Sequence, residues 1–170
     1  MLRGLVVSVL VLGLWGCSDE SEVAELTTYV KTIQKFHPYN DKVQFYLANL
    51  GDPAFDLKEQ DVIDARQLLE DYAVAVNAVG EPDENTLRHS HGLYKRSFVD
   101  ARRLAQDRTG DLKRQGHSVA IGFRNLRRDI ADRLYPSLEV LLDRKELDYE
   151  GDYALKWPFP EKIAKGCNYW

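Results

Sequence analysis

Apolar residues recur along most of the chain at intervals of three and four positions, the spacing that gathers them on one face of an α-helix. The clearest series runs from 62 to 79 with successive intervals of 3, 4, 3, 4 and 3 residues. Its members are Val62, Ala65, Leu69, Tyr72, Val76 and Val79. Similar series run over 23–33, 43–50, 87–105 and 119–141. The pattern therefore predicts helices in all of these ranges.

Residues that start, end or distort helices fall between and within these series. Asp56, followed by Glu59 three positions later, predicts a capping box before the 62–79 series. Asp83 or Asn85 is expected to cap the helix that carries the 87–105 series. Pro136 falls inside the last series. It is expected to kink that helix, because proline has no N–H to bond to the carbonyl four residues earlier.

Four principal segments joined by short turns predict an all-α fold, a four-helix bundle of two helical hairpins over residues 23–146. Alternation at 119–123 also permits a short strand, but the long helical continuation favours a helix. Residues 147–170 are rich in aromatic side chains, and Trp157-Pro158-Phe159-Pro160 cannot continue a helix. This tail is expected to pack irregularly on the bundle. Alternatively, Trp157, Phe159 and Trp170 form an aromatic site for a partner.

The first residues have the layout of a secretory signal peptide. Arg3 supplies a positive charge, and an apolar run of 13 residues follows from Gly4 to Gly16. A helix that spans a bilayer needs roughly 20 residues, so this run is too short to serve as one. A charged start, a short apolar core and a small residue before a polar stretch are typical of a segment that is removed on export.

The end of this run, Leu14-Trp15-Gly16-Cys17, resembles the lipobox of bacterial lipoproteins. The resemblance implies cleavage after residue 16, a covalent lipid on Cys17 and attachment to a membrane of the bacterial cell envelope, with residues 17–22 as a short tether. An ordinary cleaved signal peptide or an uncleaved anchor remain the alternatives. Ser18, directly after the cysteine, resembles the signal that directs a lipoprotein to the outer membrane. The outer membrane is therefore favoured over the inner one, and the helical domain is expected to face the periplasm. Asp19 and Glu20 leave the choice of membrane open.

Charge is distributed unevenly between the two halves of the chain. Residues 18–87 carry a net charge of −10 and residues 95–145 a net charge of +6, within a chain of net charge −4. Either the acidic half folds against the basic half, which we favour, or the basic half presents a face to an anionic partner. Overall acidity and an envelope location both argue against nucleic acid as a partner. If Cys17 carries lipid, Cys167 has no partner for a disulfide within the chain.

Four arginines that lie off the apolar series are the candidates for such a basic face. We refer to Arg102, Arg103, Arg127 and Arg128 as the arginine quartet. Arginine suits this role because its guanidinium group binds carboxylates and phosphates in a bidentate manner. The alternative is that these side chains pair with acidic residues of their own helices, as Arg103 with Asp107 would.

No motif of a known catalytic or metal site stands out. His89 and His91 are two positions apart and point to opposite faces of a helix, and no haem, di-iron or zinc-protease spacing is present. No metal or cofactor is therefore expected beyond the covalent lipid. The sequence favours an envelope lipoprotein with a non-catalytic helical domain that binds an envelope protein or polymer. The alternatives are an enzyme whose site assembles from scattered residues such as His89, His91 and His117, or an inhibitor or immunity-type lipoprotein.

Overall fold

The computed structural model describes residues 17–158, and every regular element in this range is a helix. The prediction of an all-α fold is therefore confirmed for this part of the chain. The elements are α1 (Cys17–Gln34), α2 (His37–Leu50), α3 (Glu59–Asn77), α4 (Asn85–Ala105), α5 (Leu112–Asp129), the π-helical turn η1 (Ile130–Leu134) and α6 (Tyr135–Arg144).

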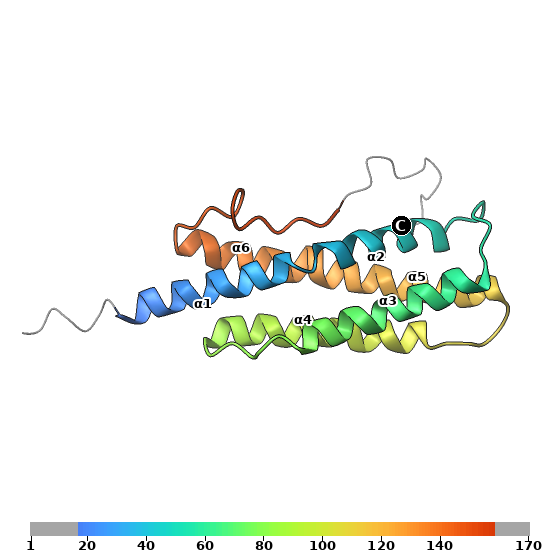
Figure 1. The fold of residues 1–170 in the computed structure, drawn as a ribbon, viewed down its shortest axis with the longest axis horizontal. Helices are drawn as coiled ribbons and strands as arrows, with labels where there is room; N and C mark the ends of the chain where they lie inside the picture. Colours follow the sequence, from blue (N-terminus) through green and yellow to red (C-terminus); the bar gives the residue numbers. More distant parts are fainter. Residues whose placement is uncertain (1–16, 159–170) are drawn as a thin grey trace, which may run out of the picture.

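The helices run along one long axis, and the chain reverses direction at the connections after α2, α3 and α4 (Figure 1). α1 and α2 follow each other along one side, and α5, η1 and α6 form another continuous stretch (Figure 1). α4 packs against both α3 and α5, and α2 lies against α3 and α5. α1 lies against α6.

Two prolines mark the irregular points of these long stretches. Pro38 lies in the first turn of α2, where its missing N–H would have had no intrahelical partner. Pro136 occupies the equivalent place in α6, and the turn before α6 is π-helical, with the Tyr135 N–H bonded to the Ile130 carbonyl. The irregularity expected at Pro136 is thus a π-helical turn, in which the chain accommodates a residue that cannot continue the α-helical bonding.

The core is made of the predicted apolar series. Leu69, Tyr72 and Val76 are each no more than 1 % exposed, as are Phe123 and Leu126 on the opposite helix. A few members of the series are only half-buried: Val23, Leu47, Val79 and Leu141. At about 25 cal/mol per Å² of apolar surface, this burial is the main contribution that stabilises the helices.

The predicted helix caps were wrong in position. α3 begins at Glu59, so Asp56 and Glu59 do not form a box; instead the Lys58 N–H donates to the carboxylate of Asp61 at 2.8 Å. α4 is capped by neither Asp83 nor Asn85 but by Glu84, whose carboxylate accepts the Leu87 N–H at 2.6 Å. A longer glutamate side chain reaches the free N–H groups of a first turn as well as the usual short caps do.

The residues predicted to be a tether, 17–22, lie in the first turns of α1. Acidic side chains such as Glu20 and Glu22 are favourable there, because the start of a helix carries a partial positive charge. Glu22 also accepts a hydrogen bond from Lys145 after α6 at 3.0 Å, which holds this part of α1 against the rest of the domain.

After α6 the chain returns along α1 and α2 without regular structure (Figure 1). Lys31 and Gln34 of α1 both donate to the carbonyl of Asp152, at 2.6 and 3.0 Å. Further on, Trp157 is 3 % exposed and its indole N–H donates to Gln44 of α2 at 3.0 Å. The described part of the tail, 147–158, therefore packs on the first two helices.

Candidate binding site

A groove of about 830 Å³ lies between α1 and the segment 75–83, which comprises the end of α3 and the connection to α4. We refer to it as the α1 groove. One wall carries small side chains of α1, and the other carries small side chains of the segment that faces it. These residues are Ser21, Ala24, Thr28 and Thr32 on α1, and Ala75, Ala78, Val79 and Gly80 opposite. Because they are small, the two walls leave room for a ligand or a partner's side chains.

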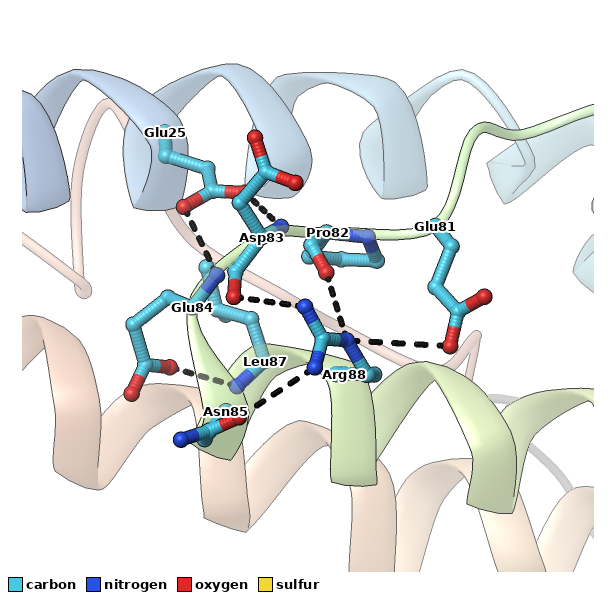
Figure 2. A network of polar contacts seen from close by, with 8 residues as sticks. All are labelled: Glu25, Glu81, Pro82, Asp83, Glu84, Asn85, Leu87 and Arg88. Atoms are coloured by element: carbon cyan, nitrogen blue, oxygen red, sulfur yellow. Dashed lines mark hydrogen bonds and ion pairs between the residues drawn. The ribbon is translucent and has the colours of Figure 1, made fainter.

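Glu25 of α1 fixes the distance between the two walls. Its carboxylate accepts hydrogen bonds from the backbone N–H groups of Asp83 and Glu84, immediately before α4 (Figure 2). N–H groups at the start of a helix have no intrahelical partner. A carboxylate is also stabilised by the positive end of the helix dipole. This contact therefore joins α1 to the start of α4.

Arg88 of α4 fixes the conformation of the connection between α3 and α4, on the side of that connection opposite Glu25. Its guanidinium group donates to the carbonyl of Pro82 at 3.1 Å and to that of Asp83 at 2.8 Å (Figure 2). It also pairs with Glu81 at 3.7 Å, but both side chains are exposed, so this ion pair contributes little. With Glu25 and Arg88 in place, the wall formed by residues 81–84 is preorganised.

Tyr29 lines the α1 groove, and its hydroxyl lies 3.3 Å from Nδ1 of His91 on α4. Burial lowers the pKa of His91, and Lys95 lowers it further, whereas Glu81 raises it. Burial also raises the pKa of Tyr29. Both groups are therefore uncharged at neutral pH, and Nε2 of His91 is buried without a hydrogen-bond partner.

A second polar cluster lies in the core, away from the groove. The Tyr72 hydroxyl donates to Oδ1 of Asn40 at 2.8 Å, and the Asn40 amide donates to the Tyr135 hydroxyl at 2.7 Å. The hydroxyls of Tyr72 and Tyr94 are 2.6 Å apart. Burial raises the pKa of all three tyrosines, so they remain neutral. This network joins α2, α3, α4 and α6, and its role is to fix how they pack.

The histidines of the alternative enzyme hypothesis are not brought together. His91 is buried, whereas His89 and His117 are exposed. Gly122 of α5 lies against Ala101 of α4, which places His117 about 25 Å from His89 along the helices. Within residues 17–158 no group of three His, Cys, Asp or Glu side chains is arranged to hold a metal ion.

The members of the arginine quartet differ in burial and in their partners. Arg102 is half-buried against α3, where it makes two contacts with the carboxylate of Glu70, one of them at 3.0 Å. Arg103 pairs with Asp100 at 3.1 Å and Arg128 with Asp129 at 3.5 Å. Arg127 is half-buried. Pairing within the chain therefore occurs, but with Glu70, Asp100 and Asp129 rather than with the residues four positions away that the sequence suggested.

Of the three residues proposed for an aromatic partner site, Trp157 is buried against α2, as described above. Phe159 and Trp170 lie outside the described residues, and so does the proposed signal peptide, 1–16.

The sequence pattern did not identify Glu25 or Arg88, because each lies beside an apolar series and nothing in the pattern shows which distant backbone group it contacts.

Comparison of the chain with protein-family models, with curated proteins and with solved structures finds no match in any of the three. Among the helices of residues 17–158, none combines the length and the apolar character needed to cross a membrane.

Proposed function

We propose that the chain is an envelope lipoprotein, anchored through a lipid on Cys17, whose helical domain binds an envelope protein or polymer in the α1 groove. The sequence supports the anchor through the resemblance of residues 14–17 to a lipobox. The observation that carries the binding role is the groove itself, since its volume lies in the range of ligand sites and Glu25 and Arg88 preorganise one wall.

The groove lies close to the proposed anchor. Ser21 and Thr32, at its two ends along α1, are about 6 and 22 Å from Cys17 at 1.5 Å per residue. A lipid on Cys17 would hold the groove next to the membrane surface, on the periplasmic side and with the outer membrane favoured. A partner there meets the anchored domain at a raised effective concentration. Masking another protein's active site would be one form of this binding.

We also propose that the domain is a four-helix bundle in which α1 and α2 together form the first member and α5, η1 and α6 the last. The packing of α4 on α3 and α5, and of α2 on α3 and α5, supports this arrangement. The C-terminal tail then lies on the first member, as the burial of Leu155 and Trp157 suggests. No catalytic role is proposed.

Site-specific cross-linking in intact cells tests the binding role. A photoreactive phenylalanine derivative is placed at Ala78, which is exposed and lines the groove, and in a control at Val99, which is 65 % exposed on α4 and does not line it. We expect a discrete cross-linked product from position 78 but not from position 99. A Thr28→Trp change, which fills the groove from the opposite wall, should remove the product.

Identical products from both positions, or a product that survives Thr28→Trp, would contradict the assignment of the groove as the binding site. Thr28 and Ala78 are both exposed, so neither change is expected to disturb the core.

A further inference from the structure

A second groove, of about 490 Å³, lies between α2 and α3 on a surface that the proposed function does not use. We refer to it as the α2–α3 groove. Phe45 and Tyr46 of α2 and Leu68 of α3 give it a mainly apolar lining. Phe45 is 58 % exposed, a high value for a phenylalanine. With Tyr46 and Leu68 beside it, this ring gives the groove an apolar surface on which the side chains of a partner can pack.

Both rims of this groove carry carboxylates. Asp41 lies on the α2 side, and Asp64 and Asp71 lie on the α3 side. The amides of Gln60 and Gln67 donate to the two α3 carboxylates at 2.7 Å each, which holds these in place along the rim.

None of the three aspartates makes an ion pair with another described residue. Arg66 on the same helix points elsewhere, since its guanidinium group donates to the carbonyls of Ala105 and Asp107. The pKa of Tyr46 is raised by burial and then by Asp64 and Asp61, as a negative potential at the groove requires. Lys42 is the one cationic side chain that lines the groove within the described residues.

We propose that the α2–α3 groove binds a basic segment of a partner polypeptide. The ammonium or guanidinium groups of the segment lie between Asp41 and the two α3 carboxylates, and their aliphatic stems pack on Phe45 and Tyr46. An aromatic face attracts a cation, and carboxylates on both sides complete its partners. The carboxylates without an ion pair and the exposed ring of Phe45 then share one explanation.

The rim also sets a spacing. Asp64 and Asp71 are seven residues apart on α3, which separates them by about 10.5 Å along the helix. Basic residues three positions apart in a polyproline II conformation lie on the same face of the chain and are about 9 Å apart. The groove therefore favours a segment in which two basic residues are separated by two intervening residues, at least one of them apolar.

The test uses the mature full chain purified from cells and a fluorescent peptide, acetyl-Ser-Lys-Ala-Leu-Lys-Ser-amide, whose binding is followed by anisotropy. We expect saturable binding that weakens as salt is raised. The double variant Asp64→Asn with Asp71→Asn keeps side-chain size and should weaken binding by about tenfold. The control, Asp132→Asn with Asp143→Asn, makes the same change in net charge at exposed positions outside the groove and should leave binding within about twofold.

Equal loss in both double variants would overturn the proposal, because it would reduce the effect to overall charge. So would binding that the Asp64 and Asp71 changes leave intact, or an absence of binding. Binding seen only after deletion of residues 159–170, which include Lys162 and Lys165, would assign the groove to the chain's own C-terminal residues rather than to a partner. This assay requires neither the lipid nor the α1 groove, so its outcome is independent of the proposed function.

Discussion

Replacing Asn40 with alanine should destabilise the domain far more than its size suggests. Asn40 is 0 % exposed and is the only side chain that bonds to both Tyr72 and Tyr135 among the described residues. Its removal leaves the Tyr135 hydroxyl without the amide donor, and Tyr72 keeps only Tyr94. Two helices then lose a buried polar contact with α2 at once.

The magnitude follows from the two hydrogen bonds and from the groups left behind. Each buried hydrogen bond contributes about 1 kcal/mol net, and a buried hydroxyl without its partner costs about 1 kcal/mol or more. The small cavity adds about 0.5 kcal/mol. Asn40→Ala should therefore lower the free energy of unfolding by about 3.5 kcal/mol, a large fraction of the stability of an ordinary domain.

Asn49→Ala is a matched control on the same helix. Asn49 is half-buried and bonds only to the carbonyl of Phe45, one turn earlier, so its replacement should cost less than about 1 kcal/mol. Urea unfolding followed by far-ultraviolet circular dichroism gives both values, provided that the denaturant slope is unchanged. In a Tyr135→Phe background the cost of Asn40→Ala should fall by about 1 kcal/mol. Equal costs for the two asparagines, or strict additivity with Tyr135→Phe, would refute the reasoning.

Three further predictions concern the core, the surface and pH. Leu69→Asp places an unpaired charge at a position 1 % exposed and should cost several kcal/mol, seen as a large fall in Tm; a shift of about one degree would refute burial there. Glutamine at all four positions of the arginine quartet should lower Tm modestly. The ion pairs of the exposed Arg103 and Arg128 contribute about 0–1 kcal/mol each, so most of the loss should come from the half-buried Arg102 and its contacts with Glu70. Cross-linking from Ala78 should be unchanged in that variant, because no member of the quartet lines the α1 groove. Weaker capture would place the quartet in the interface instead. Burial holds the pKa of His91 below its usual 6.5, so the unfolded chain binds this proton more readily. Stability should therefore be full above about pH 6.5 and decline as pH falls below it, and His91→Gln should flatten that decline in urea titrations between about pH 7.5 and 5.

The helices and most of the core could be predicted because they depend on local spacing. The series that contains Leu69 and Tyr72 places both residues in the core, since the helical period alone decides which face is apolar. The break near Pro38 and the irregular turn before Pro136 could be predicted for the same reason, as proline acts on its own neighbouring backbone.

The polar contacts that join one helix to another could not be predicted, because they link residues far apart in sequence. Glu25 meets backbone groups 58 and 59 positions away, and Asn40 meets a hydroxyl 95 positions away. Helical spacing says nothing about which polar groups of two helices meet. The same holds for Arg102, whose off-series position suggested an outward face, but whose partner is Glu70 on the neighbouring helix.

The mass of the mature N-terminus tests the central claim most directly. The protein is isolated from membranes of its native cells, and its N-terminal peptide is analysed by mass spectrometry. We expect a chain that begins at Cys17 and carries covalent fatty acyl groups on that residue, as residues 14–17 imply. A chain that retains residues 1–16, or one that begins with an unmodified Cys17, would contradict it.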